Sequence, residues 1–459
     1  MSSIKTALTD AISAELGSFI VSKSSTFACG GTIPIKQGVS DTPGDLKPAG
    51  ITFPFALRWD SKYSATGVGK LTFPVDPTNT MEMQNFSKLL EECEPASFGY
   101  KGEDVLDETY RKATKLDRSA FSVDFCPYEL GIIDRIAQIL LPNAKSDDGA
   151  HIGSSTHGVR AELYKLNIYG APSGFFKSHV DTPRSDLQFG SLVVSLPCHY
   201  EGGQLIVRHA GHSMTFDWGA SELVNTSVQW AAFYSDCEHE VLEVTEGNRV
   251  TLTYNLFYTS DIGELVGNGP TMSVKSLPLH SKIQEALDNP DFMSNGGYLG
   301  IHCQHAYAHS TKEGAQQLPG VLKGSDMAVY SVFQSLRLEI EVKSVLDSQN
   351  GLFRDQYRYY DDSDETTRKK DLSYIRRLGE VVVTETGGYE EPLQEIIDEF
   401  GDAVDVLWLT QPRHANVGMV HLTYGNQAGI NAIYTYAALI VNIPKAAIRG
   451  RASDAASFT

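Results

Sequence analysis

Three side chains in one stretch of the sequence have the types and order of a metal site. His179 and Asp181 form a His-x-Asp pair, and His239 follows well downstream, just after another predicted strand. Side chains alternate between the two faces of a strand, so the pair points to one side of an extended segment. Two histidines and one carboxylate can occupy one face of an octahedron and leave three positions open, an arrangement typical of non-haem Fe(II) oxygenases. We therefore expect all three to bind Fe(II) and to be the catalytic residues.

An arginine completes the pattern shortly beyond the second histidine. Arg249 begins a predicted strand directly after the turn Glu246-Gly247-Asn248. Two open metal positions could be chelated by the keto oxygen and C1 carboxylate of a 2-oxo acid, which leaves the third for O2. The far carboxylate of 2-oxoglutarate then needs a bidentate cation, which arginine supplies better than lysine. The spacing therefore predicts 2-oxoglutarate as cosubstrate, with Arg249 as its anchor.

The elements around these residues favour a mainly β fold with flanking helices. Residues 161–258 contain many short apolar runs separated by Gly, Pro, Asp and Asn, which is typical of a sandwich, barrel or jelly roll. Helices are predicted at the N-terminus, at 81–93 and at 131–141 from their apolar spacing. We expect three segments: 1–160 as helices and strands packing on the core, 161–258 as the catalytic core, and 259–459 as a C-terminal α/β extension.

Composition and charge narrow the range of partners. The chain has 459 residues with a net charge of −19, which argues against sequence-independent nucleic-acid binding and against docking on anionic membranes. The sequence contains no apolar run long enough to span a bilayer, and its first residues do not read as a secretory signal. Six scattered cysteines are typical of reduced thiols. We expect a cytoplasmic protein, with the nucleus as the other compatible compartment.

The residues around the metal pattern resemble a known family. HVDT from His179, DCEHEV from Asp236 and EGNRVTLTYN from Glu246 are similar to the prolyl 4-hydroxylase-like branch of the Fe(II)/2-oxoglutarate-dependent dioxygenases, as is LYKLNIYGAPSGFFKSHVD from Leu163. FACGG, LRWD and YTYAALIVNIP, which lie outside this region, resemble large uncharacterised fungal members of the branch. The resemblance implies a double-stranded β-helix, or jelly roll, with the iron at its open mouth.

The same resemblance implies further residues of the cosubstrate pocket. Tyr169, which precedes His179 on the previous predicted strand, would hydrogen-bond the cosubstrate through its hydroxyl, although an ordinary strand tyrosine is the alternative. Asn167 shares the face of Tyr169 by alternation and would also point inward, which makes it a candidate substrate-binding residue. Thr251 shares the parity of Arg249. The remaining pocket positions that the resemblance implies lie on the next strands: Ser191, Val193, Ser195, Leu205 and Thr253.

Departures from the family pattern shape the functional hypothesis. Collagen-type prolyl hydroxylases anchor 2-oxoglutarate with lysine and carry secretory signals, whereas this chain has Arg249 and no such signal is evident. We therefore expect an oxygenase that oxidises an unactivated C–H bond of a small molecule such as an amino acid or secondary metabolite. Hydroxylation is the leading outcome; desaturation and ring closure are alternatives. Halogenation is not expected because the carboxylate Asp181 is retained. Ascorbate is a candidate reductant.

Two other function classes stay open. A protein hydroxylase acting on a prolyl or other side chain is the main alternative, and a non-catalytic jelly-roll binding module is the third. Arg184, which follows His179 closely, could bind a substrate carboxylate, while a surface or lid salt bridge is the simpler interpretation. The sequence does not indicate the substrate, the oligomeric state, the role of the C-terminal extension, or whether residues 358–371 form a lid.

Overall fold

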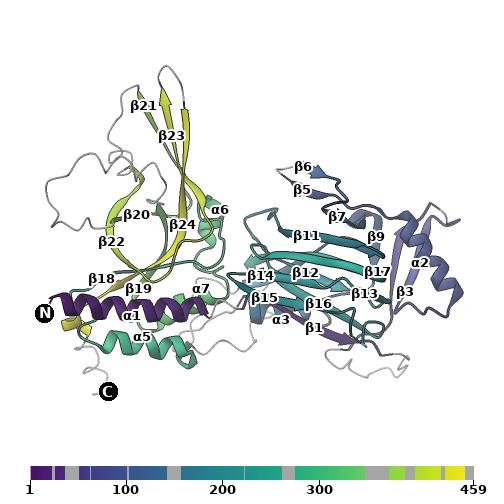
Figure 1. The fold of residues 1–459 in the computed structure, drawn as a ribbon, viewed down its shortest axis with the longest axis horizontal. Helices are drawn as coiled ribbons and strands as arrows, with labels where there is room; N and C mark the ends of the chain where they lie inside the picture. The colour runs from purple at the N-terminus through teal and green to yellow at the C-terminus, as the bar shows by residue number, and fades with distance from the viewer. Residues whose placement is uncertain are drawn as a thin grey trace. The chain divides into compact units, whose positions relative to one another are not determined.

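The structure is a computed structural model of the chain. It describes residues 2–22, 26–36, 51–62, 64–100, 103–141, 157–221, 223–260, 274–346, 372–387, 399–424 and 429–449. The proposed lid at 358–371 lies outside the described residues. Strands predominate and helices flank them, which confirms the expected mainly β class (Figure 1).

The chain divides into two compact units. The central unit comprises Ser25–Leu141 and Thr156–Pro270, and the terminal unit comprises Met1–Ser24, Pro142–Ser155 and Thr271–Thr459. The division into three consecutive segments stays a prediction.

The central unit is built on a 12-stranded sheet. Its main path runs β1-β16-β12-β17-β10-β8-β4, and β11, β13 and β14 pair with β17 off this path. The strands of this sheet are β1 (Ala28–Pro34), β4 (Glu94–Pro95), β7 (Arg111–Lys112), β8 (Thr114–Asp117), β10 (His157–Gly170), β11 (Gly174–Val180), β12 (Gln188–Ser195), β13 (Tyr200–Gly202), β14 (Leu205–His209), β15 (His212–Phe216), β16 (Ser227–Tyr234) and β17 (Glu238–Ser260).

The long strand β17 connects two groups of strands. Its first part pairs with β11 and β14, while its second part pairs with β10 and β12. The change of partners falls at Gly247, where φ is +67° and an added Cβ would lie 2.2 Å from the carbonyl oxygen of His199. Only glycine fits there without strain. The predicted turn at Glu246–Asn248 is thus a change of direction within one strand, and it places His239 and Arg249 on the same element.

Alternation along β10 and β17 separates the core from a polar face. Leu166 and Ile168 of β10 and Leu252 of β17 are buried apolar residues. The intervening residues Asn167 and Thr251 are also buried, although they are polar. Buried polar side chains need hydrogen-bonding partners or a ligand pocket. The face of the sheet that carries Asn167 and Thr251 is therefore a candidate binding site.

Smaller elements complete the central unit. The three-stranded sheet β3-β2-β9 consists of β2 (Phe55–Asp60), β3 (Val68–Phe73) and β9 (Phe121–Val123), and β5 (Phe98–Tyr100) pairs with β6 (Glu103–Val105). Helix α2 (Thr80–Glu92) packs near β3, and Asn79 caps it by accepting hydrogen bonds from two backbone N–H groups. Helix α3 (Ile132–Leu140) buries four apolar residues. The helices predicted at 81–93 and 131–141 are therefore confirmed. A 3-10 turn, η1 (Arg118–Ala120), precedes β9.

The terminal unit contains a seven-stranded sheet in the order β18-β22-β20-β19-β24-β23-β21, with helices beside it (Figure 1). Leu16 and Ile20 of α1 share an apolar core with α5, α7, β18 and β24. No helix in the described residues is both long and apolar enough to cross a membrane. The elements of this unit are α1 (Ser2–Ser22), η2 (Val274–Ser276), α5 (Pro278–Asp288), β18 (Gly297–His302), α6 (Lys312–Gln317), α7 (Gly324–Ser335), β19 (Glu339–Leu346), β20 (Leu372–Arg376), β21 (Val382–Gly387), β22 (Asp402–Trp408), β23 (Asn416–Tyr424) and β24 (Gly429–Ile443).

A buried histidine in this unit predicts acid sensitivity. His302 is 5% exposed and stacks on Trp408 with ring centroids 4.0 Å apart. Burial lowers the pKa of His302 to about 4, whereas it titrates near 6.5 in an unfolded chain. The unfolded state therefore binds the proton first as pH falls below 6.5, and stability drops until about pH 4, by roughly 3 kcal/mol in all.

His302→Phe keeps the aromatic stack and removes this titration. We expect its free energy of unfolding to fall less than that of the wild type between pH 7 and 4.5, by on the order of 2 kcal/mol. Urea unfolding at both pH values measures the difference. An unchanged pH dependence would show that His302 does not contribute.

Candidate metal centre and cosubstrate pocket

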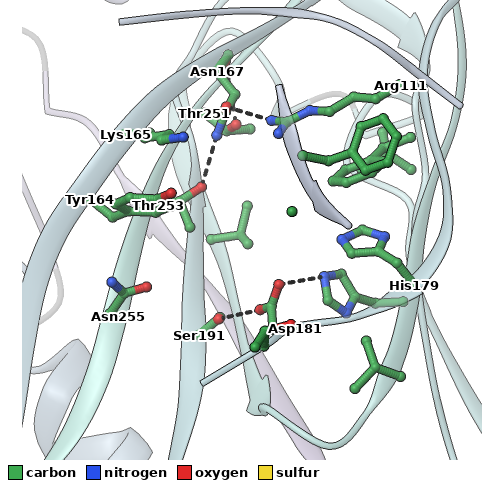
Figure 2. Close-up of a pocket in the computed structure, with 18 of the residues that line it drawn as sticks. Arg111, Tyr164, Lys165, Asn167, His179, Asp181, Ser191, Thr251, Thr253 and Asn255 are labelled. Carbon is green, nitrogen blue, oxygen red and sulfur yellow. Dashed lines mark hydrogen bonds and ion pairs between the residues drawn. The ribbon is translucent and has the colours of Figure 1, made fainter. Parts of the chain in front are cut away.

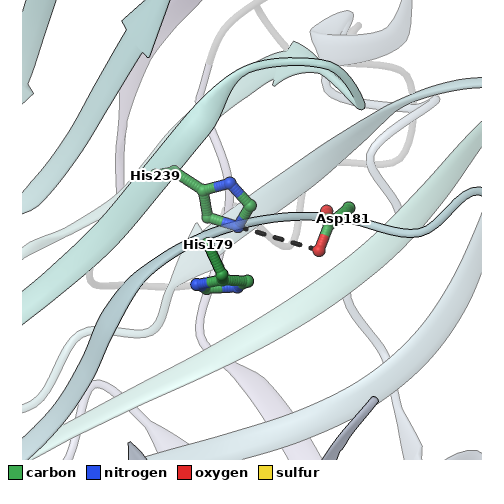
Figure 3. A group of neighbouring side chains, drawn as sticks. All are labelled: His179, Asp181 and His239. Atoms are coloured by element: carbon green, nitrogen blue, oxygen red, sulfur yellow. Dashed lines mark ion pairs between the residues drawn. The ribbon is translucent and has the colours of Figure 1, made fainter. Parts of the chain in front are cut away.

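The three predicted metal ligands lie together in the central unit. His179 and Asp181 belong to β11 and the residues directly after it, and His239 lies opposite His179 on β17 (Figure 3). One potential ligand atom from each residue lies within 4.8 Å of the others, so the group could hold a metal ion. His239 Nε2 is 3.8 Å from Asp181 Oδ1, and the two imidazole centroids are 4.2 Å apart.

Backbone hydrogen bonds orient both imidazoles. His179 Nδ1 lies 2.8 Å from the carbonyl oxygen of Lys177, and His239 Nδ1 lies 3.1 Å from that of Cys237. A carbonyl oxygen can only accept, so Nδ1 carries the proton in each ring. Each Nε2 therefore keeps its lone pair for a metal, as is usual when the second nitrogen of a ligating histidine is held by a backbone group.

The protonation states also suit a cation. Burial, reinforced by the nearby His239, lowers the pKa of His179 to about 4, so its imidazole is neutral at pH 7. Burial alone would raise the pKa of Asp181, but His239, the Ser191 hydroxyl and His179 together hold it below its ordinary value. At pH 7 the group therefore presents the neutral imidazole of His179 and the carboxylate of Asp181.

Ser191 positions the carboxylate of Asp181. Its hydroxyl donates to Oδ2 at 2.7 Å, while the other oxygen, Oδ1, faces His239. Removing such an outer partner typically weakens metal binding about 10- to 100-fold. We expect Ser191→Ala to raise the dissociation constant for Mn(II) by roughly tenfold, measured by calorimetry. Ser213→Ala, at an exposed position of β15, is the matched control. Equal affinity in the two variants would contradict the role of Ser191.

The metal group opens into a pocket of about 550 Å³ (Figure 2). Of the further predicted residues, Tyr169, Thr251, Asn167 and Arg184 line it, and Ser195 does not. Ser195 instead lies 3.2 Å from the hydroxyl of Tyr200. The other positions implied by the resemblance also line the pocket: Ser191, Val193, Leu205 and Thr253.

Arg249 is buried in the wall of this pocket. It is 1% exposed, and its Nε and Nη2 have no hydrogen-bond partner among the described residues. Its guanidinium carbon lies 5.4 Å from the ring centres of both Tyr169 and Trp218. Gly203 makes room for it, because a Cβ there would be 2.9 Å from Arg249 Cδ. A buried cation with open donors is expensive unless an anion completes it, so Arg249 fits a ligand carboxylate.

Arg111 and Phe176 are among the pocket residues that were not predicted from the sequence. Arg111, on the short strand β7, pairs with Phe176 of β11 and lies over its ring, 4.5 Å from the centroid. Phe176 in turn stacks on His179 at a centroid distance of 3.7 Å. Arg111 lies far upstream of His179 in the sequence, and no spacing rule links them. Phe176 closely follows the turn GAPSG in the segment that resembles the family. Its contact with His179 is evident only from the stacking in the structure.

The predicted substrate residue Arg184 is exposed at the edge of the pocket. Its guanidinium bonds to the hydroxyl of Tyr164 and lies over that ring. A register shift between Leu163 and Lys165 lets the successive residues Tyr164 and Lys165 both line the pocket. Arg184 is thus engaged by a neighbouring side chain.

No family model matches this chain, and no curated protein matches it. Among solved structures, a Pseudomonas putida prolyl-4-hydroxylase aligns at 20% identity and a TM-score of 0.25, over 39% of this chain and 83% of that one. A 2OG-Fe(II) oxygenase family oxidoreductase from Burkholderia pseudomallei aligns at 16% identity and a TM-score of 0.22, over 39% of this chain and 80% of that one. A Trichoplax adhaerens prolyl hydroxylase in complex with a hypoxia inducible factor peptide fragment aligns at 15% identity and a TM-score of 0.26, over 47% of this chain and 87% of that one.

Proposed function

We propose that the central unit is an Fe(II)- and 2-oxoglutarate-dependent oxygenase that oxidises an unactivated C–H bond of a small molecule. One observation carries the proposal. Two imidazoles and one carboxylate share a pocket with a buried arginine whose Nε and Nη2 have no protein partner in the described chain. A metal site alone would not require the arginine, and an anion site alone would not require the metal ligands.

Strand pairing supports a double-stranded β-helix for this unit. The path β16-β12-β17-β10 forms one group, and β11, β14 and β15 join through the first part of β17 to form a second. Strand β17 contributes to both groups. This is the pairing expected of two facing sheets whose strands alternate along the chain, with the metal ligands near one end of β11.

The residues present fit the proposed cofactors. His179, Asp181 and His239 would hold Fe(II), and Arg249 would bind the far carboxylate of 2-oxoglutarate through its two open donors. When bound, Fe(II), 2-oxoglutarate and O2 supply the oxidising power for attack on a C–H bond. The chain itself fixes the imidazole tautomers, holds the carboxylate through Ser191 and surrounds the site with buried side chains. Hydroxylation is the proposed outcome.

Pocket size and chemistry support a small-molecule substrate. A volume of about 550 Å³ lies within the range of roughly 300–1,000 Å³ that is usual for small-ligand sites. Beyond the metal group, the wall carries hydrogen-bonding side chains, among them Asn167, Thr253 and Asn255 (Figure 2). Such a wall suits a polar molecule.

Succinate release from 2-oxoglutarate tests the proposal. The full chain is incubated in air with Fe(II) and ascorbate, together with either the low-molecular-mass fraction or the protein fraction of a cell extract. We expect Fe(II)-dependent succinate release that the low-molecular-mass fraction stimulates and that His239→Ala abolishes. Stimulation by the protein fraction alone would favour protein hydroxylation instead. No Fe(II)-dependent release under any condition would overturn the proposal.

A further inference from the structure

The pocket holds a second buried arginine on the wall next to the metal ligands. Arg111 is 9% exposed, and its guanidinium points into the pocket (Figure 2). Phe176 lies between this guanidinium and His179, in contact with both. The ring of Phe176 therefore separates the Arg111 guanidinium from the proposed metal ligand His179.

Neutral groups hold Arg111 in place without neutralising it. Nη1 donates to the carbonyl oxygen of Ser97 and Nη2 to Asn167 Oδ1, each at 2.7 Å. Asn167 Nδ2 in turn donates to Thr253 Oγ1 at 3.1 Å, which fixes the amide oxygen toward the arginine. Both acceptors are uncharged. The guanidinium is oriented, but its charge is not balanced by these contacts.

One nitrogen of the Arg111 guanidinium, Nε, is buried and makes no hydrogen bond in the described structure. Asp104 and Asp181 are acidic residues of the pocket wall. Asp181 is near enough to interact electrostatically with Arg111, but no salt bridge joins either carboxylate to the guanidinium in the described part of the chain. An oriented, buried and unpaired guanidinium is costly for the protein alone, which indicates a ligand that completes it.

Other cations of the pocket differ from Arg111. Lys165 lies 3.9 Å from Asp117 in an ion pair, and Arg184 is exposed and held by Tyr164. Arg249 shares the pattern of burial and open donors, but the proposed function assigns it to 2-oxoglutarate. One oriented arginine therefore stays available for the molecule that is oxidised.

We propose that Arg111 binds a carboxylate of the substrate, so that the enzyme acts on a small carboxylic acid. The inference rests on the proposed function, because it assumes that Arg249 is taken by 2-oxoglutarate. A planar guanidinium matches a carboxylate through paired N–H donors. Asn167 is the positioning residue, since it orients Arg111 through Nη2. The acid is held on the Phe176 side of the metal group, and the C–H bond to be oxidised faces the metal ligands.

Matched acids and amides test this assignment. The full chain is loaded with Mn(II) and saturating 2-oxoglutarate, and the probes are acetate, benzoate and N-acetylglycine with acetamide, benzamide and N-acetylglycinamide. Paramagnetic broadening of each probe's NMR signal reports binding near the metal. We expect the acids to be broadened and the amides not. Because a hydrogen bond to a charged group contributes strongly, Arg111→Gln should weaken acid binding roughly 10- to 100-fold.

Two further variants guard against a folding artefact. Arg111→Lys keeps the charge and should retain part of the acid binding, while Arg135→Gln, at an exposed position of α3, should retain all of it. Equal broadening by amides and acids, no broadening by any acid, or unchanged acid binding in Arg111→Gln would each overturn the assignment. Calorimetry on the same samples reports whether 2-oxoglutarate binds. Its failure to bind would instead count against the proposed function.

Discussion

Replacing His179 by alanine is expected to abolish metal binding and 2-oxoglutarate turnover. The substitution removes one of the three donors and leaves only Asp181 and His239 near the site. Loss of an outer partner costs metal affinity about 10- to 100-fold, and loss of a direct ligand should cost more than that. We expect a dissociation constant for Mn(II) raised by more than about 100-fold and succinate release at the level of the metal-free protein.

Because His179 stacks on Phe176, a second variant is needed to separate loss of the metal ligand from loss of packing. Alanine at this position also leaves a space in the pocket wall and could lower stability. His179→Phe keeps an aromatic ring there and provides no donor atom. Both variants should fail to bind metal, while His212→Ala, at an exposed position of β15, should behave like the wild type. Turnover by a folded His179→Phe protein would contradict the proposed ligand set.

The site residues that could be predicted from the sequence are those that lie close together in the chain or share one strand. His179 and Asp181 are separated by a single residue on an extended segment, and strand alternation alone places them on one face. His239 and Arg249 share β17, so the parity of Arg249 and Thr251 could also be anticipated. The structure brings the three ligand residues together as expected. Their role as iron ligands is what the experiments above test.

Arg111 was beyond sequence reasoning for a physical reason. It lies on the very short strand β7, whose composition gives no periodic signal, and it reaches the site by pairing with β11, which comes much later in the chain. Ser195 shows the converse limit. The resemblance implies that Ser195 lines the pocket, yet its hydroxyl lies beside that of Tyr200 and Ser195 is not among the lining residues. Alternation predicts the face of a strand but not how far a pocket extends along it.

The N-terminal helix shows the same limit for the fold. Apolar spacing predicts which side of α1 is buried, and Leu16 and Ile20 are indeed buried. The spacing does not indicate the partner. The helix packs with α5 of the terminal unit, from which the whole central unit separates it in the sequence. A hydrophobic stripe is compatible with any apolar surface, so only the folded chain identifies its partner.

Substitution of Arg249 should separate cosubstrate binding from metal binding. Arg249→Lys keeps the charge but replaces a planar fork by a point charge on a flexible stem. Losing one hydrogen bond to a charged group typically costs about 1.5–3 kcal/mol, or roughly 10- to 100-fold in affinity. We expect the dissociation constant for 2-oxoglutarate to rise by that factor, while that for Mn(II) stays unchanged. Arg160→Lys, an exposed arginine paired with Glu162, is the control.

Arg249→Met should produce opposite changes in stability and binding. In the ligand-free protein, Arg249 is a fully buried cation with two unpartnered nitrogens in the described structure. Replacing such a charge by an apolar side chain of similar length is often neutral or stabilising. We therefore expect the melting temperature of ligand-free Arg249→Met to equal or exceed that of the wild type, while 2-oxoglutarate binding falls by more than about 100-fold.

These opposite signs distinguish a binding residue from a structural one. If Arg249 served only to hold β17, its loss would lower the melting temperature, and cosubstrate affinity would fall only as far as the folded fraction does. Thermal unfolding of the ligand-free proteins measures the melting temperature, and calorimetric titration of the Mn(II)-loaded proteins with 2-oxoglutarate measures the affinity. Wild-type affinity in Arg249→Met would exclude Arg249 as the anchor. The assignment of Arg111 to the substrate would then lose its premise, because the second arginine would be free for either carboxylate.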